Sequence, residues 1–400
     1  MIVGGAQENT LLSCALIDRA RYPSEILCGP EAGTEGSLHE ECRARGVAVH
    51  VEPALVRDVR PHLDLLALWR LTRFFRRHRP DIVHTHTSKA GILGRIAARW
   101  AGVPHIVHTA HGWGFTPGQS PFVHRIYVEL ERMCARYCDL IPVVADVNRE
   151  DALRLGIGTP AQYRTIRSGI EIAAYRDTTV TRAMARSRID VPEDAFVVGT
   201  VGRLSLQKAP LDLLAAFARV ARTRPDAHLV FVGDGPLRGE LAAAIGREGL
   251  TSRVHILGLR RDVPELQRAF DVFALSSRWE GLPRVFPQAM AAGLPIVATR
   301  VNGAADAIQD GVTGFLVEVG DGPGMAARLA ELAADPARAR AMGAAGRERV
   351  DEFSAERMVR QLEAAYRALH EGREPPADPS AGAGDGRTRG GLERSGASAA

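Results

Sequence analysis

The residues best suited to chemistry lie between Arg278 and Thr299, in the segment RWEGLPRVFPQAMAAGLPIVAT. A lone acid, Glu280, stands in a turn-rich loop, and Gln288 follows in the first turn of a short Ala-rich helix. Pro287 favours the first position of that helix, because the N–H group that proline lacks would have no partner there. A helix N-terminus offers free N–H groups and partial positive charge to an anion. An acid beside it predicts a ligand with both phosphate and hydroxyl groups, such as a nucleotide sugar.

Two cations follow a different strand. Arg203 and Lys208 lie in GRLSLQKAP, directly after FVVGTVG. Arginine offers a fixed fork of N–H donors and lysine a point charge, so the two can converge on a diphosphate. A solvated basic loop would be the better interpretation of such a pair alone, but its place beside GRL at a strand end favours phosphate binding.

Glycine and histidine mark two further loops. Gly4 and Gly5 form a turn that opens a helix, where N–H groups can approach a phosphate without interference from a Cβ atom. His111 ends the strand HIVHTA and is predicted at a cleft mouth. Other histidines are near it in sequence: His84, His86, His105 and His108. A metal cluster is conceivable, but no acid joins these residues, so hydrogen-bonded strand-end histidines are the preferred interpretation.

Strands and helices alternate along the whole chain. The expected strands are Ser24–Cys28, Val47–Glu52, Asp81–His86, His105–Thr109, Leu140–Ala145, Tyr163–Ser168, Phe196–Val201, His228–Gly233, Val254–Leu257, Val272–Leu275, Pro295–Thr299 and Gly314–Val317. The expected helices between them include Leu63–His78, Gly91–Trp100, Leu211–Thr223, Leu237–Glu248 and Met325–Ala333. This pattern predicts parallel sheets covered by helices on both faces. The motifs above fall at strand ends, where open α/β sheets bind ligands.

The segment around Glu280 resembles the donor-site signature of retaining glycosyltransferases of family 4, in which two acids are separated by seven residues (EGLP…EAMA). Gly281, Leu282 and Pro283 are in register, but Gln288 stands where the family has its second acid. The resemblance implies that Glu280 binds donor-sugar hydroxyls and that Gln288 binds the ribose. It further implies that Arg203 and Lys208 clamp the diphosphate and that the Gly4–Gly5 amides assist them.

The same resemblance implies further roles. His111 would lie near the donor sugar and the acceptor, and Arg260, in the loop GLRRD, near the nucleobase. The residues taken as catalytic are therefore Glu280, Arg203, Lys208 and His111. Those taken to bind the donor are Gly4, Gly5, Arg203, Lys208, Arg260, Gly281, Leu282 and Gln288. No metal and no cofactor is expected, since this class works without one, and a UDP-sugar is the expected donor.

The family fold is GT-B, with two facing Rossmann-like domains. We expect an acceptor domain over residues 1–176, a donor domain over 177–371 with the polar stretch Asp177–Asp194 as linker, and a disordered tail over 372–400. A last helix over Ala355–Leu369 is expected to cross back to the first domain. The first strand of the family fold is short here, because only Met1–Val3 precede the glycine turn and three residues span only ~10 Å.

Composition excludes several other classes. A length of 400 residues favours two domains, and a net charge of +4 without an aromatic-interleaved basic patch argues against nucleic acid as a partner. Five cysteines without framework spacing favour a reducing compartment, with Cys134 and Cys138 as packing residues. No apolar run approaches the ~20 residues of a membrane span, so a cytoplasmic protein is expected. The helix Leu63–Arg79 carries Arg70, Arg73, Arg76 and Arg77 on an apolar background, which predicts either an ordinary surface helix or contact with the inner membrane surface.

The expected activity is transfer of a sugar from a nucleotide diphosphate sugar to a glycan or lipid-linked acceptor, in the synthesis of exopolysaccharide or another glycoconjugate. A nucleotide-sugar 2-epimerase of the same architecture remains an alternative, which a product test without acceptor would separate. A non-catalytic sugar-nucleotide binding protein also remains open, because of the short first strand and Gln288. An NAD oxidoreductase is the weakest alternative, since the glycines after LVFV do not form the dinucleotide fingerprint.

Overall fold

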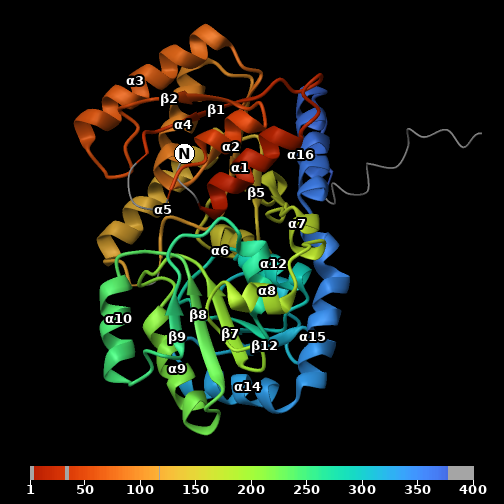
Figure 1. The fold of residues 1–400 in the computed structure, drawn as a ribbon. Helices are drawn as coiled ribbons and strands as arrows, with labels where there is room; N and C mark the ends of the chain where they lie inside the picture. The colour runs from red at the N-terminus through yellow and green to blue at the C-terminus, as the bar shows by residue number, and fades with distance from the viewer. Residues whose placement is uncertain (1–3, 32–35, 117, 377–400) are drawn as a thin grey trace, which may run out of the picture.

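The computed structural model describes residues 4–31, 36–116 and 118–376 as two α/β halves, one above the other (Figure 1). The short strand expected over Met1–Val3 lies outside the described residues, as does the predicted tail from residue 377 onward. Both halves are built from parallel strands with helices between them. This is the GT-B arrangement that the sequence predicted.

The upper half contains the first six strands. Its elements are α1 (Gly5–Leu16), β1 (Glu25–Cys28), α2 (His39–Ala44), β2 (Ala48–Val51), α3 (Pro61–His78), β3 (Ile82–His86), α4 (Ser88–Ala101), β4 (His105–Thr109), α5 (Pro121–Ala135), β5 (Ile141–Val143), α6 (Asp146–Arg154) and β6 (Tyr163–Thr165). The helix that follows, α7 (Ile172–Arg176), packs with the core of the lower half. The strands pair in parallel as β1 with β2, β3 with β4, and β5 with β6. Bridges from Val107 to Leu140 and from Ala110 to Val143 join β4 to β5.

The lower half contains one parallel sheet of six strands, in the order β12-β11-β10-β7-β8-β9. The strands are β7 (Phe196–Val201), β8 (Ala227–Val232), β9 (Val254–Ile256), β10 (Val272–Leu275), β11 (Ile296–Thr299) and β12 (Gly314–Val317). Its helices are α8 (Arg182–Ser187), α9 (Pro210–Thr223), α10 (Arg238–Arg247), α11 (Val263–Leu266), α12 (Val285–Ala292), α13 (Ala304–Ala307), α14 (Gly322–Ala334) and α15 (Pro336–Arg349). The last helix, α16 (Ala355–His370), leaves this half.

Both faces of the lower sheet are buried, because successive apolar residues of its strands point to opposite sides. Val198 packs with α9 and α14 on one face, and Val197 packs with α12 on the other. Gly293, in the left-handed conformation at φ 77°, ends α12 and lets the chain turn directly into β11. The sheet therefore holds the loops after β7 and β10 next to each other, because β7 and β10 are neighbours and run in parallel.

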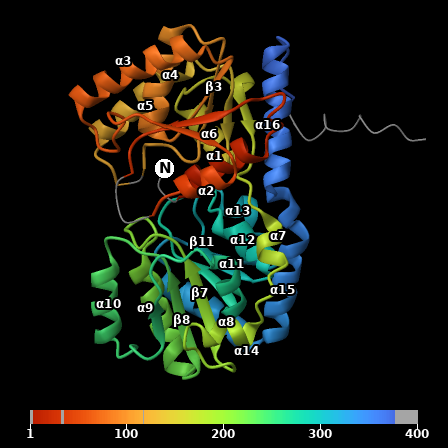
Figure 2. The same cartoon turned by 45° about the horizontal axis from the view of Figure 1, so that its top comes forward.

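The chain crosses between the halves twice. The stretch expected as a polar linker is packed on the lower half, because Val180, Ala185 and Ile189 join its core and Arg186 forms an ion pair of 2.8 Å with Asp271. At the other end, α16 returns along the side of the upper half, as the two views in Figure 1 and Figure 2 show. Its apolar face packs there with residues of α1, β4 and β5. The upper half is thus closed by a helix from the C-terminal end of the chain.

All twelve expected strands are present. Ten of them end where the sequence placed them or within one residue, and the largest difference is at β6, which ends three residues early at Thr165. The expected helix start at Pro287 is wrong, because α12 begins at Val285 and Pro287 is its third residue. The first four N–H groups of any helix lack partners within it, so proline is tolerated at the third position as well as at the first.

Candidate active site

Glu280 and Lys208 form the centre of the candidate site. Lys208 follows β7 and Glu280 follows β10, and the Lys208 Nζ atom lies 2.5 Å from Glu280 Oε1. Only 9% of the Glu280 side chain and 22% of the Lys208 side chain are exposed. Gln207 supports the acid, because its Nε2 atom donates to the Trp279 carbonyl at 3.0 Å and lies 3.5 Å from Glu280 Oε2. The sequence had placed these two charges in separate motifs, and the fold brings them into contact.

Arg203 lies near the same loop. With Gly202, Lys208 and Ser276 it lines a small pocket at the carboxyl ends of β7 and β10, and its side chain is exposed. The loop is held at Ala209, which adopts the left-handed conformation at φ 47°. That conformation strains a residue with a Cβ atom. The Ser276 hydroxyl fixes the loop by donating to the carbonyls of Lys208 at 3.1 Å and Ala209 at 2.8 Å.

Gln288 is on the buried side of α12. Only 9% of the residue is exposed, and it lies in the first turn of the helix as expected. Leu282, which the sequence placed among the donor-binding residues, is also buried, at 7% exposure, in the core below the loop. Its side chain therefore packs, and only its backbone is available to a ligand.

The loop of Glu280 touches the upper half at Gly281. A Cβ atom on Gly281 would lie 1.9 Å from the His111 carbonyl oxygen, so only glycine fits at this contact. On the other side, Gly303, at φ 64°, is packed against the Gly281 carbonyl, and a Cβ atom there would lie 2.2 Å from it. His111 and Glu280 are thus brought to one seam between the two halves, although 169 residues separate them along the chain.

Arg284 crosses the same seam and was missed by the sequence analysis. Its guanidinium forms an ion pair with Glu8 on α1 and donates to the Gly169 carbonyl at 3.1 Å. Only 9% of the side chain is exposed, and its stem lies beside Gly5, 3.6 Å from where a Cβ atom would be. The helix N-terminus at Gly5 is therefore held against the loop of Glu280. A lone arginine after a proline gives no signal of this contact in the sequence.

Two histidines of β3 form a stacked row with His111, which follows β4. The His84 and His86 rings stack at a centroid distance of 4.4 Å, and the His86 and His111 rings stack at 5.2 Å. Burial lowers the pKa of His86 to about 4 and holds the pKa values of His84 and His111 well below 6.5. These side chains are therefore neutral near neutral pH. The interpretation of most of them as hydrogen-bonded strand-end residues agrees with this geometry.

Two family descriptions match the two halves in turn. Residues 4–169 match the glycosyl transferase 4-like domain, and residues 195–335 match the glycosyl transferases group 1. The UDP-Gal:alpha-D-GlcNAc-diphosphoundecaprenol alpha-1,3-galactosyltransferase of Escherichia coli is 31% identical over 323 residues, which cover 80% of this chain and 82% of that protein. This chain belongs to the glycosyltransferases. The D-inositol 3-phosphate glycosyltransferase of Saccharomonospora viridis is 32% identical over 72% of this chain and 70% of its own.

Solved structures support the fold of this glycosyltransferase. HepE of Anabaena, in complex with UDP and glucose, superimposes with a TM-score of 0.78 at 24% identity, over 91% of this chain and 96% of that one. The sucrose-phosphate synthase of Thermosynechococcus elongatus gives a TM-score of 0.76, also at 24% identity, over 92% and 94%. The GT-B fold is thereby established. The relatives are named as glycosyltransferases, so the alternative of a nucleotide-sugar epimerase is not favoured.

Arg260 of the glycosyltransferase is already engaged by an acid. It lies in the loop after β9, the edge strand of the lower sheet, and its guanidinium forms a two-pronged ion pair with Asp262 at 2.8 and 2.6 Å. Its neighbour Arg261 donates to the Ser37 carbonyl of the upper half at 3.3 Å. Neither contact brings Arg260 to Glu280 or Lys208, so its predicted place at the nucleobase stays a prediction.

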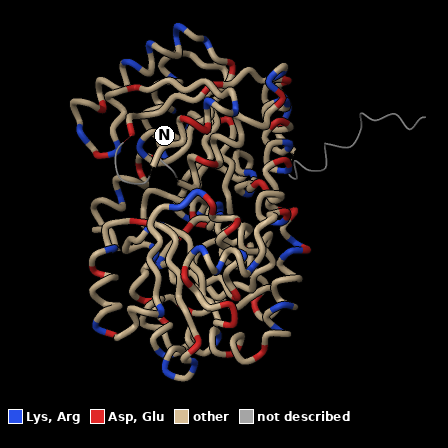
Figure 3. Tube along the Cα trace, in the orientation of Figure 1, with Lys and Arg blue, Asp and Glu red and all other residues tan. Residues whose placement is uncertain are grey.

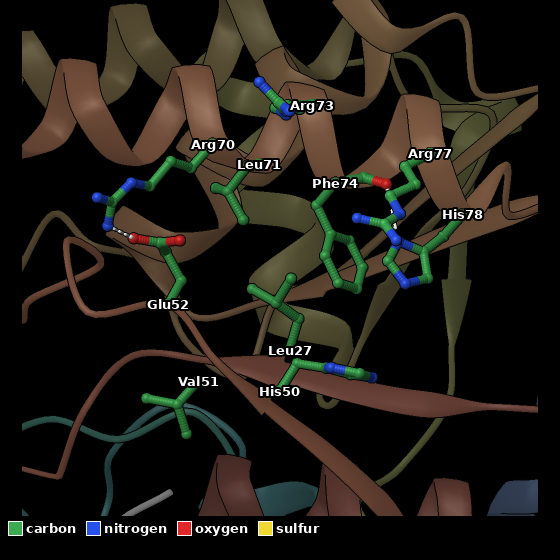
Figure 4. Close-up of a pocket in the computed structure, with 10 residues that line it drawn as sticks. All are labelled: Leu27, His50, Val51, Glu52, Arg70, Leu71, Arg73, Phe74, Arg77 and His78. Atoms are coloured by element: carbon green, nitrogen blue, oxygen red, sulfur yellow. Dashed lines mark hydrogen bonds and ion pairs between the residues drawn. The ribbon is translucent and has the colours of Figure 1, made fainter.

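A second cavity lies away from the seam. It has a volume of about 360 Å³ and lies between β2 and the second half of α3 in the upper half (Figure 4). Phe74 and Leu27 point into it, and Arg70, held by Glu52 at 3.0 Å, closes one side. None of the predicted site residues lines this cavity. Its size alone therefore does not make it the active site.

The described residues contain neither a candidate metal site nor a helix that could cross a membrane. In that part of the chain no group of three or more His, Cys, Asp or Glu side chains is arranged to hold a metal ion. No helix within it is both long and apolar enough to cross a bilayer. Cys134 and Cys138 are buried in the upper half, as expected of packing residues. Lys89, in the first turn of α4, forms an ion pair with Asp64 and donates to the Val56 carbonyl at 2.9 Å.

Proposed function

We propose that this glycosyltransferase moves a sugar from a nucleotide diphosphate sugar to a glycan or lipid-linked acceptor, with retention of the anomeric configuration. The observation that carries the proposal is the contact of Lys208 with Glu280 at the seam that also holds His111. A cation and an acid side by side match a donor that has its diphosphate next to the hydroxyls of its sugar. Arg203 would add a second cation at the diphosphate, and Gln288 would bind the ribose.

The proposed reaction breaks the bond from the sugar C1 atom to the diphosphate oxygen and forms a bond from C1 to the acceptor oxygen. The diphosphate leaves with the electron pair, and Lys208 and Arg203 stabilise the charge that grows on it. Amide groups at Gly4 and Gly5 would assist from the start of α1. The acceptor proton goes to an oxygen of the leaving phosphate, on the same face as the departing group, which accounts for retention. Glu280 holds sugar hydroxyls, and His111 holds the sugar and the incoming acceptor.

We propose UDP as the leaving group and no requirement for a divalent metal. The Escherichia coli relative is named for UDP-Gal, and HepE is described with UDP, which favours UDP as the first probe. Arg203 and Lys208 provide at the diphosphate the positive charge that a metal supplies in other transferases. The check is transfer measured in EDTA and again with added Mg²⁺ or Mn²⁺. Activity abolished by EDTA and restored by one metal would refute metal independence.

We also propose contact with the surface of an anionic membrane, through α3, α4 and α5 of the upper half. Large apolar side chains on these helices are exposed, including Leu65 at 69%, Trp69 at 57% and Phe122 at 73%. Basic residues are spaced along the outer edge formed by α3 (Figure 3), and the Arg73 guanidinium lies over the Trp69 ring at 5.8 Å. Apolar side chains surrounded by arginines suit the boundary between headgroups and acyl chains. An acceptor linked to a lipid would be delivered at this surface, as in polysaccharide synthesis.

Vesicle flotation tests the membrane proposal. The wild type should float with phosphatidylglycerol vesicles, and changing Leu65 and Trp69 to Ser should abolish flotation. The matched control is Val312→Ser, because Val312 is 53% exposed in the lower half and away from these helices. Equal flotation of all three proteins would refute this surface.

The test of the main proposal is product analysis with a panel of nucleotide sugars and a mixture of lipid-diphosphate sugar acceptors. The expected product is a glycoside whose anomeric configuration matches the donor, as read by proton coupling constants in NMR. Glu280→Gln should lose most of the transfer. Asp212→Asn is the control, since Asp212 is a nearby acid that pairs with Arg278 rather than with Lys208. An inverted product, or wild-type transfer by Glu280→Gln, would overturn the proposal.

A further inference from the structure

The row of histidines is fixed by the pairing of two strands. His86 of β3 is the register partner of Thr109 of β4, and alternate residues of a strand point to the same face. His84 and His86 therefore share a face with Thr109, and His111 continues that face beyond the end of β4. The planes of the His84 and His86 rings differ by 27°, and those of His86 and His111 by 28°. Three nearly parallel rings thus lead from the interior to the seam.

The inner end of the row is anchored at both nitrogens of one ring. His84 Nδ1 lies 2.5 Å from the Tyr366 hydroxyl, and His84 Nε2 lies 2.7 Å from the Thr109 hydroxyl. Tyr366 belongs to α16, the helix that returns from the C-terminal end of the chain. A ring bonded on both sides cannot rotate without breaking a bond. His84 therefore provides a fixed surface on which His86 stacks.

The outer end of the row is a hydrogen bond between two imidazoles. His86 Nδ1 lies 2.9 Å from His111 Nε2, and the two rings stack beside this contact. Both rings are neutral near neutral pH, because burial lowers both pKa values. A neutral imidazole carries one proton, so one nitrogen donates and the other accepts. If His86 Nδ1 donates, the proton of His111 must be on Nδ1. If His111 Nε2 donates, the proton of His86 must be on its own Nε2. The two rings therefore always share one tautomer.

We propose that His86 is a positioning residue for His111, which sets the tautomer and the ring plane that His111 presents at the active site. The inference rests on the proposed role of His111 beside the donor sugar and the acceptor. With His86 in place, the Nδ1 atom of His111 donates when His86 Nδ1 carries its proton and accepts when it does not, so the tautomer of His111 follows that of His86, and the 2.9 Å contact holds the ring plane. Without it, the ring can flip and exchange its proton, and only a fraction of the enzyme would meet the sugar correctly. This pairing joins residues 25 positions apart and carries no motif of its own.

The experiment combines ¹⁵N NMR of histidine-labelled enzyme with steady-state kinetics. His86→Phe keeps an aromatic ring between His84 and His111 but has no nitrogen, and His86→Asn offers a side-chain amide near the position of Nδ1. In His86→Phe we expect the ¹⁵N shifts of His111 to move to those of a tautomer mixture. We expect kcat to fall at least about tenfold, as when the orienting partner of a functional histidine is lost, with the donor KM nearly unchanged. His86→Asn should partly restore the wild-type ¹⁵N shifts of His111 and part of the lost kcat.

The matched control is His105→Phe, which removes a histidine at the start of β4 outside the row. It should leave the His111 shifts and kcat as in the wild type. Unchanged His111 shifts in His86→Phe would overturn the positioning role, whatever the kinetics show. His111→Ala distinguishes the two proposals: full activity in that variant would refute the catalytic place of His111, while the His86-dependent ¹⁵N shifts could still hold.

Discussion

Removing the charge of Glu280 should have opposite effects on transfer and on nucleotide binding. In the structure, the Glu280 carboxylate accepts a hydrogen bond from the Lys208 ammonium at 2.5 Å. The proposed reaction needs that lysine at the diphosphate and that acid at the sugar. A diphosphate and Glu280 therefore compete for Lys208. Glu280→Gln keeps the shape of the side chain and replaces the ion pair with Lys208 by a weaker, uncharged hydrogen bond.

The magnitudes follow from the geometry. A hydrogen bond to a charged group contributes about 1.5–3 kcal/mol, and about 1.4 kcal/mol is a factor of ten in an equilibrium or rate constant. Loss of such bonds to sugar hydroxyls should lower kcat/KM for transfer roughly ten- to a hundredfold. Lysine has three N–H donors, so Glu280 withholds only part of the ammonium from a diphosphate. The gain in UDP affinity should therefore be smaller, about three- to tenfold.

The assay is isothermal titration calorimetry with UDP, run beside transfer kinetics. Glu280→Gln should bind UDP more tightly and transfer more slowly, whereas Lys208→Met should lose both. Asp212→Asn removes a nearby negative charge that does not contact Lys208, and should change neither by more than about twofold. If Glu280→Gln weakened UDP binding and transfer together, the Glu280 carboxylate would contribute to nucleotide binding. Glu280 and the diphosphate would then not compete for Lys208.

Four further predictions rest on other residues of the site. Arg203→Ala should weaken binding of UDP far more than binding of uridine, and equal losses in calorimetry would remove Arg203 from the diphosphate. Gln288→Glu should be active and bind donor more tightly by on the order of 1 kcal/mol, since a carboxylate accepts from ribose hydroxyls more strongly. Because position 288 is only 9% exposed, the unliganded variant should also melt at a lower temperature, and an unchanged melting temperature would contradict this. Arg284→Met breaks the ion pair with Glu8 across the seam and should lower the free energy of unfolding in urea by roughly 1–3 kcal/mol, whereas Arg300→Met, at an exposed pair, should cost at most about 1 kcal/mol. The pKa of His86 in the folded protein, about 4, lies below its value in the unfolded chain. The contribution of neutral His86 to the free energy of unfolding is therefore present above about pH 6.5 and is lost as the pH falls towards 4. His86→Phe should reduce this loss of stability at acid pH in urea melts, and an equally steep loss in the variant would show that His86 does not cause it.

The sequence was sufficient to predict where the strands lie and which loops follow them. Period-two and buried apolar runs are local signals, so Phe196–Val201, Val272–Leu275 and His105–Thr109 were placed without error. Charged and glycine residues directly after such strands could be assigned to one edge, because parallel strands end on the same side of a sheet. This logic placed Lys208 and Glu280 near the same ligand before their contact was known.

Contacts that join distant segments could not be predicted in the same way. Tyr366 reaches His84 from a helix 282 positions away, and only the return of α16 to the upper half creates that bond. The linker was also misjudged, because Asp177–Asp194 looks polar in sequence while its few apolar residues, such as Ile189, complete the core of the lower half. Helix starts were imprecise for a related reason: several positions of a first turn tolerate proline equally well.

The seam explains why neither half alone defines the site. In the loop of Glu280, Gly281 packs against the His111 carbonyl on one side, and its own carbonyl packs against Gly303 on the other. The direction of the Glu280 carboxylate is therefore set by both halves at once. Arg284 adds a third restraint by tying the same loop to the start of α1, where the Gly4–Gly5 amides lie. Any relative movement of the two halves must change the distance from these amides to Lys208. A donor bound to both would favour the arrangement in which Glu280 and His111 face the same sugar, so that donor binding and assembly of the catalytic groups become one event.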